Sequence, residues 1–153
     1  MEDIIDFEII KKNFRRGMYR YIGSGSSRRV FDLRNGFVVK VAMNRGGFSQ
    51  NQVEYNVYHQ EHSDLFAPIL AISEDAKFLI MKKGKKLKNL RQVLRYFGVN
   101  NMRQLVNNPY FIRIREEYGL CKGDLVRRSS WGLIDHVPVL IDYGFTGRNK
   151  GHK

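Results

Sequence analysis

Two aspartates eighteen residues apart place the strongest constraint on how this chain can fold. Asp124 lies in the segment C-K-G-D-L at 121–125, which we expect to be a loop. Asp142 follows the apolar run V-L-I and opens the triplet D-Y-G at 142–144. If the fold brings both carboxylates to one site, the first can accept a proton from a hydroxyl group and the second can hold a magnesium ion beside phosphates. Taken singly, each has an ordinary explanation, because aspartates beside glycines commonly form turns or helix caps.

A glycine-rich turn is predicted upstream, between strands at 19–22 and 29–33. Residues 23–30 read G-S-G-S-S-R-R-V, and glycines such as Gly23 and Gly25 let a backbone approach a phosphate and direct its N–H groups toward it. The turn alone is weak support for a phosphate site, because many tight hairpins contain Gly-Ser-Gly. Arg28, near its end, either adds positive charge toward a phosphate or points to solvent.

A lysine and a glutamate follow the turn in an order that suits a nucleotide cleft. Lys40 interrupts an apolar strand predicted at 37–42, and because burying an unpaired lysine is costly, it should face a partner or a polar cleft. An outward-facing lysine on a half-exposed strand is the ordinary alternative. Glu54 is predicted on a helix that begins at Ser49, which forms a capping-box pattern with Gln52. A pair between Lys40 and Glu54 would hold the lysine extended toward nucleotide phosphates.

The remaining pattern predicts an α+β fold in a single domain. Further strands are expected at 68–72 and 77–81, helices at 90–97, 102–106 and 109–118, and a short hairpin at 132–134 and 137–141. The spacing of apolar residues changes to the helical period of about 3.6 after the lysine-rich segment 82–88, which is predicted to be a solvated loop. We therefore expect an antiparallel β-rich N-terminal lobe with one helix over about residues 1–82, and a reduced helical C-terminal lobe over about residues 83–153.

Size and composition narrow the class of protein. The 153 residues, 42% of them hydrophobic, can bury a core. No run approaches the roughly 18 apolar residues that cross a membrane, and the N-terminus lacks a signal pattern. A single cysteine, Cys121, excludes an intramolecular disulfide and suits a reducing cytoplasm. The net charge of +12 predicts attraction to polyanions, whether nucleotides, nucleic acids, acidic proteins or an anionic membrane face.

From about Tyr19 to Gly144 the chain resembles the protein-kinase-like superfamily, which includes protein kinases and aminoglycoside and choline phosphotransferases. The segment G-D-L at 123–125 is similar to the H-G-D-L catalytic loop of the small-molecule phosphotransferases, and D-Y-G at 142–144 is similar to the D-F-G triplet. Arg28 stands where the family has the third glycine of its loop, Lys122 where it has a histidine, and Ser129 where it has a metal-binding asparagine. The family's activation segment and larger helical subdomain have no counterpart before residue 153, so we expect a truncated member of the superfamily.

The resemblance implies a role for each residue of the series. Asp124 would be the catalytic base, and Lys40, anchored by Glu54, would contact the α- and β-phosphates of ATP. Asp142 and Ser129 would bind Mg²⁺. The residues that the resemblance implies for binding ATP are Gly23, Ser24, Gly25, Val30, Lys40, Glu54, Met81 and Lys82, the last two in the hinge segment that meets adenine.

The leading hypothesis is an ATP- and Mg²⁺-dependent phosphotransferase that acts on a protein hydroxyl or on itself, since several serines flank the predicted site. Its basic charge favours an acidic protein as partner or substrate. The alternative is a pseudokinase that binds nucleotide or a protein partner without catalysis, which Ser129 and the end of the chain at residue 153 favour. A basic nucleic-acid-binding protein is a third hypothesis, based on the net charge and the lysine-rich segment. Such a compact chain also fits a bacteriophage product acting in the host cytoplasm.

Overall fold

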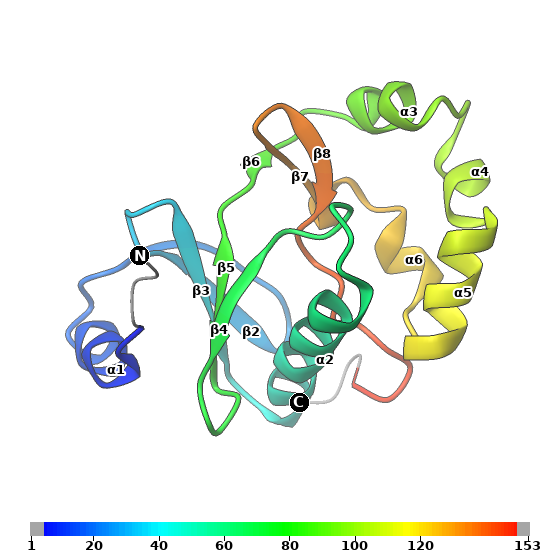
Figure 1. The fold of residues 1–153 in the computed structure, drawn as a ribbon. Helices are drawn as coiled ribbons and strands as arrows, with labels where there is room; N and C mark the ends of the chain where they lie inside the picture. Colours follow the sequence, from blue (N-terminus) through cyan, green and yellow to red (C-terminus); the bar gives the residue numbers. More distant parts are fainter. Residues whose placement is uncertain (1–4, 150–153) are drawn as a thin grey trace.

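The first half of the chain forms a five-stranded antiparallel sheet in the computed structural model, which we describe for residues 5–149 (Figure 1). The strand order is β1-β2-β3-β5-β4. The strands are β1 (Arg20–Ser24), β2 (Arg28–Asp32), β3 (Phe37–Ala42), β4 (Ile69–Ile72) and β5 (Phe78–Lys82). Their ends lie within two residues of the predicted ones, because the alternation of polar and apolar residues and the turns between them are strong local signals.

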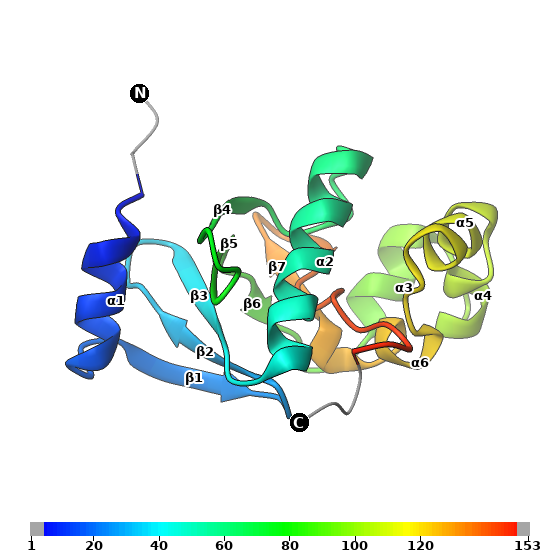
Figure 2. The same cartoon turned by 90° about the horizontal axis from the view of Figure 1, so that it is seen from below.

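Two helices cover opposite faces of this sheet, as Figure 2 shows. These helices are α1 (Phe7–Arg15) and α2 (Arg45–Glu61). Val39 and Val41 of β3 belong to a buried cluster with Ile10 of α1, whereas Val38 belongs to a second cluster with Val57 of α2. Because successive side chains of a strand point to opposite faces, β3 is covered on both sides, apart from the polar position Lys40.

Helix α1 was not predicted, so the β-rich part of the chain has two helices where the sequence analysis expected one. The Asp6 side chain caps the helix by accepting a hydrogen bond from the Glu8 backbone N–H at 3.0 Å. Phe7, Ile10 and Phe14 follow at helical spacing, and the Phe14 ring packs edge-on against rings of the sheet. The cap and this spacing are the sequence signals that identify the helix.

Helix α2 begins four residues before the predicted capping box. Its N-cap is Asn44, whose side chain accepts a hydrogen bond from the Gly47 N–H at 3.1 Å. Gly46 and Gly47 are poor helix formers, but both are buried. A Cβ atom on Gly47 would overlap the carbonyl oxygen of Ser27, so the close approach of α2 to the β1–β2 turn requires glycine there.

The second half contains a smaller sheet and a group of short helices. The three-stranded sheet has the order β6-β7-β8, and both of its strand pairs are antiparallel. The elements are β6 (Lys85–Lys86), α3 (Arg91–Phe97), α4 (Met102–Val106), α5 (Pro109–Tyr118), α6 (Lys122–Leu125), a 3₁₀ turn (Arg128–Ser130), β7 (Trp131–Ile134) and β8 (Val137–Leu140).

Two predictions in this half are corrected. The lysine-rich segment contains strand β6 and the buried Leu87, so it is not simply a solvated loop. Asp124 lies in helix α6, not in a loop. Both elements are very short, and their formation depends on pairing with β7 and on burial of Leu125, which a sequence pattern does not reveal.

One continuous apolar cluster joins the two halves. It includes Phe66, which follows α2, and Trp131 and Tyr143 from the second half, all three almost completely buried. The Ala67 N–H donates to the Leu140 carbonyl oxygen at 2.8 Å and extends the connection to the backbone. The α+β fold with antiparallel sheets is therefore confirmed. Within residues 5–149, no helix combines the length and apolar character needed to cross a membrane.

Candidate functional site

A cleft of about 590 Å³ lies beneath the β1–β2 turn. Its walls come from this turn, from β3, from the end of β5 and the residues after it, from the segment after α6, and from the segment after β8. The residues singled out from the sequence that line the cleft are Gly23, Ser24, Gly25, Val30, Lys40, Met81, Ser129 and Asp142. Residues more than a hundred positions apart are thus brought to one cavity.

Three of the singled-out residues do not line this cleft. Glu54 is completely buried behind it. The Lys82 N–H donates to the Pro68 carbonyl oxygen at 2.8 Å, and its neighbours Lys83 and Gly84 line the cleft in its place. Asp124 is only 2% exposed.

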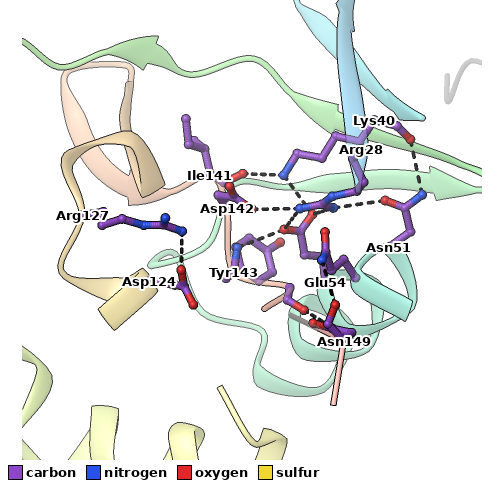
Figure 3. Close-up of polar contacts among 12 residues, drawn as sticks. Arg28, Lys40, Asn51, Glu54, Asp124, Arg127, Ile141, Asp142, Tyr143 and Asn149 are labelled. Carbon is purple, nitrogen blue, oxygen red and sulfur yellow. Dashed lines mark hydrogen bonds and ion pairs between the residues drawn. The ribbon is translucent and has the colours of Figure 1, made fainter. Parts of the chain in front are cut away.

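Lys40 and Glu54 form the ion pair that their order in the sequence suggested. The Lys40 Nζ lies 2.9 Å from Glu54 Oε1 and also donates to the Ile141 carbonyl oxygen at 2.6 Å (Figure 3). Burial lowers the pKa of Lys40, although the carboxylates nearby oppose this effect. The lysine is therefore held at the back of the cleft by α2 on one side and by the segment before Asp142 on the other.

Arg28 takes a position that neither alternative from the sequence described. Its side chain points inward from β2, and the residue as a whole is 5% exposed. Nη1 and Nη2 donate to the two carboxylate oxygens of Glu54 at 2.8 and 3.0 Å. Nη1 also donates to Asn51 Oδ1 at 3.1 Å, and Nη2 to Asp142 Oδ1 at 2.8 Å (Figure 3). A bidentate pair of this kind is stronger and more directional than a lysine contact.

The cluster of Arg28, Lys40, Glu54 and Asp142 has two positive and two negative side chains, so its formal charges cancel. Burial alone would raise the pKa of Glu54, but Arg28 and Lys40 lower it to about 2. Burial raises the pKa of Asp142, and the two cations only partly offset this effect. Glu54 is therefore the carboxylate that these cations stabilise most, and Asp142 is the less favourably placed of the two.

The triplet Asp142-Tyr143-Gly144 is packed against α2. The Tyr143 ring is buried against Phe66, and its hydroxyl donates to the Ala67 carbonyl oxygen at 3.1 Å. The Tyr143 N–H donates to Glu54 Oε2 at 3.0 Å, so one glutamate anchors both walls of the cleft.

The segment after this triplet folds onto the N-terminal part of α2. A Cβ atom on Gly144 would lie 2.5 Å from the Gln50 carbonyl oxygen, so only glycine fits there without displacement of the backbone. Asn149 Nδ2 donates to the Ser49 hydroxyl at 3.1 Å and to the Gly144 carbonyl oxygen at 2.9 Å. Ser49, which was predicted to cap the helix, therefore holds this segment against α2 through its hydroxyl group.

Asp124 forms an ion pair with Arg127, which lines the cleft (Figure 3). Arg127 also lies over the Phe145 ring, 5.5 Å from its centre. Arg127 and Phe145 are cleft residues that were not predicted from the sequence, which left two alternatives open for Arg28. The arginine in place of a loop glycine was the available signal for Arg28, but no signal in the sequence indicates which arginine near Asp124 contacts it.

The residues present do not fit a magnesium ion in this arrangement. Proteins usually hold Mg²⁺ with one or two carboxylates together with substrate phosphates. Here Oδ1 of Asp142, the predicted ligand residue, accepts a hydrogen bond from Arg28, so a positive charge already lies at the carboxylate that a metal ion would bind. Within residues 5–149 no group of three or more His, Cys, Asp or Glu side chains could hold a metal ion. The cations and the glycine-rich turn do fit a polyphosphate.

Comparisons with known proteins identify the fold. No protein-family model matches the chain, and no curated protein matches it. A solved structure of a gentamicin complex of APH(2")-IIa is similar over 94% of this chain and 71% of that chain, with 16% identity and a TM-score of 0.50. The streptomycin–ATP complex of APH(2")-IIa matches 65% of this chain with 21% identity and a TM-score of 0.41, and this chain spans 34% of its length. The bifunctional kinase-methyltransferase WbdD matches 77% of this chain with 22% identity and a TM-score of 0.39, over 29% of its own length. The similarity to the gentamicin complex confirms the protein-kinase-like fold that the sequence predicted.

Proposed function

We propose that the cleft binds ATP and that the protein is an ATP-dependent phosphotransferase. The observation that carries this proposal is the Lys40–Glu54 ion pair next to Asp142, at the back of a cleft of about 590 Å³ covered by a glycine-rich turn. Phosphate transfer depends mainly on positioning and on positive charge beside the phosphates. A lysine held by two acceptors on opposite walls provides both.

The roles that we propose follow the positions of the residues in the cleft. The glycine-rich turn at 23–25 covers the phosphates, although its Gly25 N–H donates to the Arg28 carbonyl oxygen, and Lys40 contacts the phosphates from the back. Val30 and Met81 contact the base from the apolar wall of the cleft. Asp124 accepts the proton of the acceptor hydroxyl, which requires it to separate from Arg127.

The proposed acceptor is a hydroxyl group on a protein, or a serine of the chain itself. Ser24 and Ser129 line the cleft and are exposed, so either can meet a bound nucleotide in the same or a second molecule. The net charge of +12 favours an acidic protein as substrate. The structure whose similarity covers most of this chain is a complex with gentamicin, so a small hydroxylated molecule is the acceptor to test against a protein.

Transfer of label from γ-labelled ATP tests this proposal. We expect label on the chain itself or on an acidic protein, and loss of that label in Asp124→Asn. We expect Lys40→Met to bind ATP about ten- to a hundredfold more weakly, since a charge-assisted hydrogen bond contributes about 1.5–3 kcal/mol. Lys88→Met, a matched change of an exposed lysine outside the cleft, should bind ATP as the wild type does. ATP binding without label transfer would refute the phosphotransferase, and absence of ATP binding as well would refute the proposed nucleotide site.

A nucleotide-binding pseudokinase is the second candidate, and one observation favours it. Arg28 binds Asp142 and Arg127 binds Asp124, so both aspartates that transfer requires are paired with arginines. This candidate predicts that ATP binds and raises the melting temperature, while no label is transferred to any acceptor. Label transfer that depends on Asp124 would exclude it.

A further inference from the structure

Arg28 connects three separate parts of the cleft. It is the first residue of β2, directly after the glycine-rich turn, and it contacts α2 through Asn51 and Glu54. Its fourth contact is Asp142, which is 114 residues away in the sequence (Figure 3). A guanidinium group has four N–H bonds on its two terminal nitrogens, and four acceptor contacts account for them. Arg28 therefore acts on the carboxylates and has only its Nε–H left for a ligand.

The net charge of the cluster of Arg28, Lys40, Glu54 and Asp142 determines whether a metal ion would bind there. Without Arg28, the set of Lys40, Glu54 and Asp142 would have a net negative charge, which a divalent cation compensates. With Arg28 the formal charges cancel, and the positive charge already lies 2.8 Å from Asp142 Oδ1. A divalent cation at that oxygen would have to displace a charge-assisted hydrogen bond and would face two buried cations.

The walls of the cleft show the same excess of positive charge. Its acidic lining within the described residues is Asp142 alone, which is already paired. Its basic lining residues are Arg28, Lys40, Lys83, Lys86 and Arg127. The side chains of Lys83 and Arg127 are about half exposed, but each is paired with a carboxylate, Asp32 or Asp124, which a bound phosphate would have to replace. A polyphosphate finds compensating charge in this cleft without bringing a metal ion.

We propose that the cleft binds a nucleoside triphosphate without a divalent cation, because Arg28 takes the place of the metal ion at Asp142. This inference rests on the proposed nucleotide binding and is independent of whether phosphate is transferred. Arg28 neutralises Asp142, whose charge would otherwise repel the phosphates, and the phosphates are bound by Lys40 and Lys86.

The affinity for ATP, measured by calorimetry in EDTA and in excess Mg²⁺, tests the inference. We expect the two dissociation constants of the wild type to agree within about threefold. In Arg28→Gln the unpaired carboxylate becomes available, and Mg²⁺ should then strengthen ATP binding by about tenfold or more. Arg29→Gln is the matched control, because Arg29 is exposed on the same strand and does not line the cleft. It should respond to Mg²⁺ as the wild type does.

Several results would overturn the inference. If the wild type loses about tenfold or more of its ATP affinity in EDTA, the protein binds ATP together with a metal ion. If Mg²⁺ does not change the ATP affinity of Arg28→Gln, Arg28 does not take the place of a metal ion. If ATP binds under neither condition, the proposed function fails together with the inference. If ATP binds only with Mg²⁺, the inference alone fails.

Asp142→Asn provides a second test if Arg28→Gln does not fold. It removes a negative charge from the cleft, so ATP should bind in EDTA as tightly as to the wild type or more tightly. If Asp142 holds a metal ion, the same variant should instead bind ATP about tenfold more weakly in Mg²⁺, which would overturn the inference.

Discussion

Glu54→Gln tests whether the buried carboxylate holds the cleft together. Glu54 is completely buried and bonds to Arg28, Lys40 and the Tyr143 N–H. Removal of one partner from a buried ion pair leaves uncompensated charge and costs about 3–5 kcal/mol. The lowered pKa leads to a similar figure, because a change from the ordinary 4.5 to about 2 corresponds to about 3 kcal/mol of folded-state stabilisation of the carboxylate. We expect the variant to lose about 3–5 kcal/mol of its free energy of unfolding at pH 7.

The lowered pKa of Glu54 also predicts how acid changes the difference in free energy of unfolding between the wild type and Glu54→Gln. A carboxylate whose pKa is lowered by folding contributes stability that is fully present above its unfolded pKa and disappears as the pH falls toward its folded pKa. For Glu54 this window extends from about pH 4.5 down to about pH 2. About 2 kcal/mol of the contribution should be gone at pH 3. The gap between wild type and variant should therefore narrow by that amount between pH 7 and pH 3.

Urea unfolding followed by tryptophan fluorescence measures both quantities. Trp131 is the only tryptophan of the chain and is 1% exposed, so it reports loss of the core. Glu116→Gln is the matched control, because Glu116 is an exposed residue of helix α5 and its change should stay within about 0.5 kcal/mol. A cost for Glu54→Gln below about 1 kcal/mol, or a gap that does not change with pH, would refute the reasoning.

Three further substitutions, measured by urea unfolding, test contacts elsewhere in the fold. Gly144→Ala should cost about 1–3 kcal/mol, because its Cβ would lie 2.5 Å from the Gln50 carbonyl oxygen, whereas Gly147→Ala meets no atom within 4 Å and should be neutral. Glu61→Gln should cost about 1–2 kcal/mol, because Glu61 accepts hydrogen bonds from three side chains of α5, one of them half-exposed. Asp6→Ala should cost about 1 kcal/mol through the cap of α1, and an unchanged stability would show that this helix does not stabilise the sheet.

Much of the fold was predictable because its strands follow local sequence patterns of apolar residues and turns. The strand from Phe37 to Ala42 is continuous and apolar except for Lys40, and it lies where the sequence predicted. The short elements were not predictable, since α6 and β6 have four and two residues and depend on partners elsewhere in the chain. The early start of α2 was hidden by glycines at 46 and 47, which usually oppose a helix and are needed here for close packing on the β1–β2 turn.

The site was only partly predictable, because spacing indicates which residues are brought together but not which contacts they make. The order of the glycine-rich turn, Lys40, Glu54 and Asp142 predicted a common cleft. It did not predict that Arg28 would point inward, because an arginine beside a surface turn is usually solvated. Only the positions of Glu54 and Asp142 in space make the buried arginine favourable, through three charge-assisted hydrogen bonds.

The two candidate functions differ at Arg127 more than at Arg28. Phosphate transfer needs positive charge on the phosphate oxygens, and the terminal N–H groups of Arg28 are all engaged by protein acceptors. Lys40 supplies one charge, and Arg127 is a further cation with a half-exposed side chain in the cleft. Arg127 is also the residue that pairs with Asp124, so its movement onto a bound phosphate would bring charge to the phosphate and release the proposed base from the arginine. A transferase therefore requires this exchange of partners when nucleotide binds, whereas a pseudokinase keeps the Asp124–Arg127 pair intact.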